Sequence, residues 1–129
     1  MAGPYTTDKG KNVITDRLQT TPATYTNGPK YVAYGEGSGV AQSGNALSAQ
    51  VQNKSTGTET IVTTPGGVTG DTYQVIATIT ANDAYAITES GLFLDSANAT
   101  GDMFAYSDFL EVNLNDGDSI QFTWSVQFT

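Results

Sequence analysis

The stretch that decides the fold class is Ser119-Ile120-Gln121-Phe122-Thr123-Trp124-Ser125-Val126-Gln127-Phe128-Thr129. Apolar residues occupy every even-numbered position, and polar residues occupy every odd-numbered one. Because successive side chains of a β-strand point to opposite faces, this alternation predicts a strand with one face in a core and the other in solvent. We expect loss of this strand to unfold the domain, with Trp124 as a structural residue.

The residues just before this strand predict a hairpin. Leu110, Val112 and Leu114 share one face of a preceding strand. For both strands to face one core, the numbers of two residues that lie opposite each other must add up to an even number. A three-residue turn of residues 115–117 meets this condition. Gly117 would then adopt a left-handed conformation. The predicted register places Val112 opposite Ile120 and Leu110 opposite Phe122.

Period-two patterning extends over most of the chain from residue 31 onward. Turn-forming residues such as the Pro65-Gly66-Gly67 run separate the alternating segments. About eight short strands predict an all-β fold, an antiparallel β-sandwich or jelly-roll-like barrel over residues 31–129. The expected segments before the final pair are Tyr31–Gly35, Asn45–Gln52, Thr58–Thr64, Thr72–Asn82, Tyr85–Leu94 and Met103–Tyr106.

The first thirty residues follow a different pattern. Residues 1–7 read as an N-terminal arm that becomes ordered only when something holds it. Thr7 or Asp8 can cap a short helix that continues to about Gln19, and Pro22 stops it. Residues 8–30 therefore form a short helix and turn segment of what we expect to be a single domain.

The composition excludes several classes of function. The 129 residues carry a net charge of −8, with five basic residues in all, so we expect no nucleic acid and no anionic membrane as partner. His and Cys are absent, which removes the common catalytic triads and the His or Cys ligands of metals. No apolar run is long enough to span a bilayer. We expect no catalytic residue, no cofactor and no metal.

Two loops could be mistaken for ligand sites. The Gly35–Gly39 loop superficially resembles a phosphate-binding loop, but it lacks the following Lys-Ser/Thr and contains Glu36, which favours a plain loop. The Asn115–Asp118 turn, and the pair Asp95 and Asp102, could offer oxygen ligands to calcium. Neither has the ligand number of a known calcium loop, so a turn is favoured.

Glu89 is the most informative single residue. Alternation places it on the same face as Ile87 and Phe93, where a carboxylate must be paired or the strand must bulge. Gly91 would allow the bulge, and Arg17 or free N–H groups at the helix start would pair with the carboxylate. A catalytic role would require a second carboxylate and a pocket, so a structural role is favoured for Glu89 and Gly91.

Tyrosines gather in the first third of the sequence. They could stack on sugars or form an interface, and they suit half-buried strand positions equally well. The possible interface residues are Tyr5, Tyr25, Tyr31 and Tyr34.

Four stretches, together with the helix of residues 7–18, resemble a group of small structural proteins encoded by tailed phages and related archaeal viruses. They are Tyr31–Gly37, Asp71–Val75 with its threonine-rich strand, Ile87–Phe93 and Gly117–Trp124. The Asp95–Asp102 loop is longer than we expect for such proteins.

The resemblance implies a non-enzymatic virion protein made in the host cytoplasm. The preferred expectation is a capsid decoration or cement protein on the head surface, a homo-oligomer with a trimer as the expected state, which bridges major capsid protein subunits. The arm would gain order on docking. The alternatives are a tail, baseplate or fibre component that contacts host glycans, and a carboxylate-dependent glycan hydrolase using Glu89 or Glu36.

Overall fold

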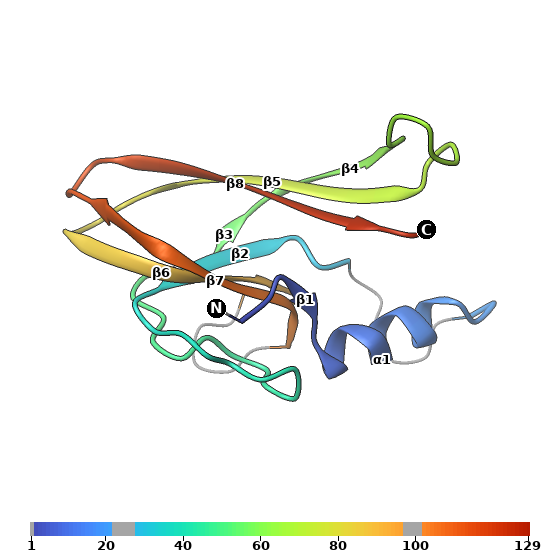
Figure 1. Cartoon of the computed structure of the whole chain (residues 1–129), viewed down its shortest axis with the longest axis horizontal. Helices are drawn as coiled ribbons and strands as arrows, with labels where there is room; N and C mark the ends of the chain where they lie inside the picture. The colour runs from blue at the N-terminus through green and yellow to red at the C-terminus, as the bar shows by residue number, and fades with distance from the viewer. Residues whose placement is uncertain (1, 22–27, 97–101) are drawn as a thin grey trace.

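The computed structural model describes residues 2–21, 28–96 and 102–129, which form two stacked antiparallel sheets and one short helix (Figure 1). This confirms the all-β sandwich expected from the sequence. The described elements are β1 Tyr5–Thr6, α1 Asp8–Arg17, β2 Tyr31–Gly35, β3 Ser55–Thr56, β4 Thr58–Val62, β5 Thr72–Thr80, β6 Tyr85–Phe93, β7 Met103–Leu114 and β8 Ser119–Gln127.

The two sheets differ in size and in what covers them. The larger sheet has the order β1-β7-β6-β2-β3, and the smaller has the order β4-β5-β8. Their facing sides enclose the main core, to which β5 contributes Val75, Ala77 and Ile79, as its alternation predicts. The opposite side of the larger sheet is covered by the segment between β2 and β3 (Figure 1).

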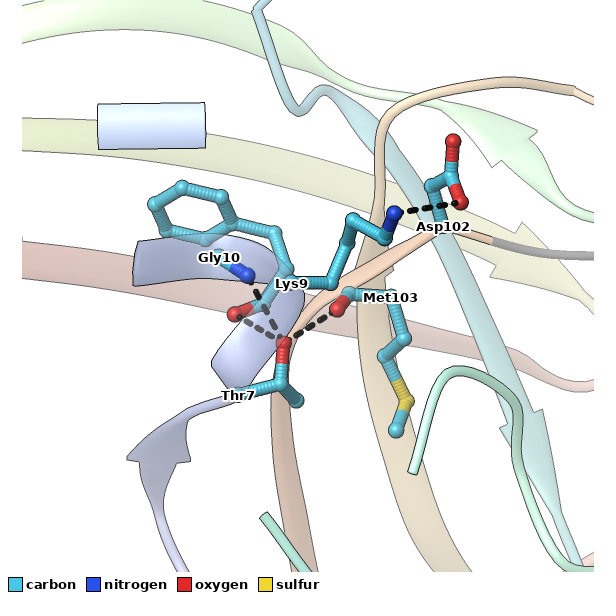
Figure 2. A network of polar contacts seen from close by, with 6 residues as sticks. Thr7, Lys9, Gly10, Asp102 and Met103 are labelled. Atoms are coloured by element: carbon cyan, nitrogen blue, oxygen red, sulfur yellow. Dashed lines mark hydrogen bonds and ion pairs between the residues drawn. The ribbon is translucent and has the colours of Figure 1, made fainter. Parts of the chain in front are cut away.

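Helix α1 begins where the sequence predicts and packs against the end of β7. The hydroxyl of Thr7 accepts a hydrogen bond from the Gly10 N–H at 3.0 Å, which makes Thr7 the N-cap. The same hydroxyl donates to the backbone carbonyls of Met103 and Phe104 (Figure 2). Gly10 lies so close to β7 that a Cβ atom there would sit 2.3 Å from the Phe104 carbonyl oxygen. The helix ends at Arg17, two residues before the expected position.

Residues 2–7 are held by the chain's own fold, which differs from the arm that the sequence suggests. Tyr5 and Thr6 pair with Tyr106 and Ala105 of β7. Ala2 and Asp108 are joined by two hydrogen bonds, one through each backbone N–H. The expectation that this arm needs docking to become ordered is therefore wrong for residues 2–7, because β7 offers a free edge to pair with.

The predicted hairpin between β7 and β8 is also wrong, since these strands belong to different sheets. β8 pairs instead with β5, with Ile120 opposite Ile79 and Phe122 opposite Ala77. The expected core face of the preceding strand is correct only at its end, since Leu114 is buried whereas Leu110 is 80% exposed and Val112 38% exposed. Gly117 has the predicted left-handed conformation, with φ of +89°, in the turn that carries the chain between the sheets.

Two further segments differ from the sequence analysis. Residues 45–52 form no strand and contribute a single bridge between Gln50 and Gly35. Residues 103–114 form one long strand, β7, where two separate ones were expected.

Candidate functional site

The Glu89 carboxylate lies at the centre of a closed network on the outer side of the larger sheet. The residue is fully buried, with 0% of its surface exposed. Its two oxygens accept hydrogen bonds from the backbone N–H groups of Gly37, Ser48 and Ala49 at 3.2, 3.1 and 2.8 Å. A fourth donor, the Tyr106 hydroxyl of β7, lies 3.0 Å away. We call Glu89 and these four donors the Glu89 clamp, because they tie the segment after β2 onto the sheet.

The clamp corrects two expectations about Glu89, its partners and the face that it shares with Ile87. Its described partners are loop N–H groups and a tyrosine, which take the place assigned to Arg17 or the helix start. Glu89 and Phe93 face the outer side, whereas Ile87 lies in the main core. The change of face coincides with a register shift between Ile87 and Glu89, where β7 carries extra residues opposite Thr88.

Gly91 has a packing role, and the bulge expected there lies elsewhere. It pairs in register with Tyr106, between the two register shifts of β6 and β7. A Cβ atom at Gly91 would lie 2.8 Å from a ring carbon of Phe93 and 2.9 Å from the Met103 sulfur. Gly35 is similarly constrained, since its Cβ would lie 2.4 Å from Glu89 Oε2. Both glycines therefore make room for the clamp and the cluster around it.

The electrostatics of the clamp favour a neutral tyrosine beside a carboxylate. Burial, followed by the hydrogen bond to Glu89, raises the pKa of Tyr106 above its ordinary value. The hydroxyl therefore remains a donor throughout the physiological pH range. The arrangement satisfies a buried carboxylate with fixed donors and leaves it little bonding capacity for a substrate.

An open depression of about 670 Å³ lies beside the clamp and is lined in part by Glu36 and Asp108. Both carboxylates already accept backbone hydrogen bonds. Glu36 bonds the Ala86 N–H at 2.8 Å, and Asp108 bonds the N–H groups of Ala2 and Gly39 at 2.6 and 3.0 Å. Within the described ranges, no three acidic residues are grouped so as to hold a metal ion.

The tyrosines suggested as an interface do not gather at one place. Tyr34 is only 1% exposed, and its hydroxyl donates to the side-chain oxygen of the partly buried Gln52. Tyr5 on β1 packs on Tyr106, while Tyr31 lies on β2 of the same sheet, separated from β1 by β7 and β6. Tyr25 lies outside the described residues.

A site that the sequence analysis missed is the free edge of β8. The pairs Phe128 with Asp71 and Ala81 with Asp118 are joined by hydrogen bonds in the β5–β8 register. Because bonding alternates along an antiparallel pair, the even-numbered residues of β8 direct their N–H and C=O groups to β5. The odd-numbered residues direct theirs outward, and their side chains are exposed. They are Ser119, Gln121, Thr123, Ser125 and Gln127.

This edge differs from the other sheet edges in the described part of the chain. β1 and β3 are two residues long, and β4 is five residues long and carries Glu59. β8 is nine residues long, pairs without a register shift, and contains no charged residue and no proline. Charges, prolines, bulges and short length are the usual devices that keep a strand edge from pairing with another chain. β8 has none of them.

Apolar surface accompanies the β8 edge. A groove of about 390 Å³ opens between the two sheets there, with Phe109, Phe122 and Trp124 among its lining residues. Trp124 is half-buried, and its indole N–H is buried without an acceptor among the described residues. On neighbouring β7, Leu110 and Val112 are 80% and 38% exposed.

Comparisons with protein-family models, with curated proteins and with solved structures gave no match. Across residues 2–21, 28–96 and 102–129, no helix has both the length and the apolar character that a membrane span requires.

Proposed function

We propose that this chain is a virion structural protein, a capsid decoration or cement protein that binds the outer surface of a viral head and bridges major capsid protein subunits. The observation that carries the assembly role is the free edge of β8, which is long, regular and uncharged. A chain that acts by packing against copies and neighbours needs such a surface, whereas a chain that acts alone usually protects its edges.

The stretches that resemble viral structural proteins support this proposal by what they do in the fold. Tyr31–Gly37 and Ile87–Phe93 pair as adjacent strands and form part of the Glu89 clamp. Gly117–Trp124 forms the turn between the sheets and the first part of β8. These residues maintain the scaffold and its edge, which a building block requires.

The net charge of −8 fits a location on the outside of the particle, away from packaged nucleic acid. Many copies, each making a modest contact, would reinforce a shell by summed interface burial. The expected state is a symmetric homo-oligomer, and the local threefold sites of icosahedral shells favour a trimer.

The test is to locate and count the protein in purified particles of the virus that encodes it. Quantitative mass spectrometry should find hundreds of copies per particle, and electron cryomicroscopy of labelled particles should place them on the head. A few copies at the tail tip would replace the proposal with the tail alternative. Absence from the particles would overturn both.

A further inference from the structure

We infer that β8 is the place where two copies of this chain associate, by antiparallel pairing of β8 with β8 of a second copy. The result is one continuous six-stranded sheet across a twofold axis. This inference concerns the contact between copies and does not depend on the virus particle. It also replaces the expected trimer, because a contact made by the same strand of both copies closes at two.

The first argument is the unused bonding capacity of the edge. Five residues of β8 each present a backbone N–H and C=O outward, and no described residue of the chain bonds to them. A regular row of such groups is specific for one kind of occupant, an extended strand with the same repeat.

The second argument identifies that strand as a copy of β8. Each copy carries a net charge of −8, so most surfaces of two copies repel each other. Residues 119–129 contain no charged side chain, and two copies of this segment can lie side by side without opposing like-charged side chains. The acidic turn residues Asp116 and Asp118 stand at one end of the strand. Antiparallel pairing keeps the two acidic turns at opposite ends, whereas parallel pairing would bring them together.

The third argument is self-complementarity in one register. The residues whose backbone groups point outward are odd-numbered. A twofold axis at Thr123 places each of them opposite an odd-numbered residue of the second copy, so that outward-pointing groups meet each other. Gln121 then lies opposite Ser125 of the second copy. On the inner face, the same register places Phe122 beside the second copy's Trp124. The aromatic residues that line the open groove would thus be covered by their own counterparts.

The experiment is measurement of molar mass for the full chain and two single variants over a range of concentrations. The wild-type chain should reach twice its monomer mass of 13.5 kDa. Thr123→Lys places two like charges opposite each other at the axis and should weaken dimerisation by about tenfold or more. The matched control is Thr60→Lys, which places the same change on the same sheet face but at the opposite edge, and it should remain dimeric.

A mixing experiment tests the register itself. Thr123→Glu should weaken dimerisation to a similar extent, and an equimolar mixture of the Lys and Glu variants should recover the dimer, because position 123 then meets the opposite charge. Circular dichroism and thermal denaturation check that each variant remains folded, as expected for an exposed side chain. Any of three results would overturn the inference. They are a wild-type chain that is monomeric at every concentration, a wild-type chain with three times the monomer mass, and a dimer that Thr123→Lys does not weaken. A monomeric chain found on viral heads would overturn this contact alone.

Discussion

The Glu89 clamp and the β8 edge differ in whether their backbone hydrogen-bonding groups have partners. In the clamp, one buried carboxylate satisfies three loop N–H groups and the Tyr106 hydroxyl. Along β8, five residues direct both backbone groups away from the sheet, where no described residue bonds to them. The comparison separates a part of the chain whose backbone groups are satisfied within one copy from the part that, in our proposal, pairs with another chain.

The clamp can be broken most severely at Glu89 itself. Glu89→Ala removes the acceptor of four donors, and we expect a loss of about 4 kcal/mol in the free energy of unfolding, measured by urea denaturation. Glu89→Gln keeps one acceptor oxygen and should lose less. The matched control is Glu111→Ala, an exposed acidic residue on β7, which should change stability by less than about 0.5 kcal/mol. Equal effects of Glu89→Ala and Glu111→Ala would contradict the clamp.

Tyr106 provides a second test of the clamp, because its contribution to the free energy of unfolding should depend on pH. Tyr106→Phe removes a hydrogen bond to a carboxylate and should cost about 2 kcal/mol at pH 7. The raised pKa of Tyr106 means that the folded state favours the neutral phenol. The stabilisation is therefore complete below the unfolded-state pKa of about 10 and is lost as the pH rises above it.

The measurement is urea denaturation of the wild-type chain and Tyr106→Phe between pH 7 and 11. The variant should lose less stability over the alkaline part of this range than the wild-type chain does. Tyr31→Phe, at a partly exposed position on β2, is the control and should follow the wild-type curve. Parallel curves for the wild-type chain and Tyr106→Phe would contradict the assignment.

The smallest expected effect lies in the turn before β8. Gly117→Ala meets no atom within 4 Å, so its cost should come from the left-handed backbone alone, about 1 kcal/mol. Asp116→Ala in the same turn tests a position without positive φ and should cost less. Dimer formation should survive both changes. A loss of dimer in Gly117→Ala with the fold intact would show that the edge depends on this turn.

Local signals in the sequence predicted much of the fold. The Tyr31–Gly35 strand, the Thr7 cap and the core face of β5 each depend on residues close together in the chain, and the structure confirms them. Gly117 was predictable because a left-handed turn position strongly favours glycine.

Non-local relations account for what the sequence analysis missed. The pairing partner of β8 could not be predicted from alternation. Alternation indicates which face of a strand is buried, but it does not indicate which strand lies beside it. The face of Glu89 depends on extra residues in β7, a strand some twenty residues further along the chain. The absence of charge in residues 119–129 was visible, but its meaning depends on β8 lying at an edge, and strand order sets that.

The Thr7 contact also constrains when the chain can fold. Its hydroxyl bonds to the Met103 carbonyl, 96 residues away, and the neighbouring residues of β1 pair with the same strand. Closing so long a loop is slow, and during synthesis β7 must leave the ribosome before the first strand has anything to pair with. The larger sheet is therefore completed late, by residues that were made first.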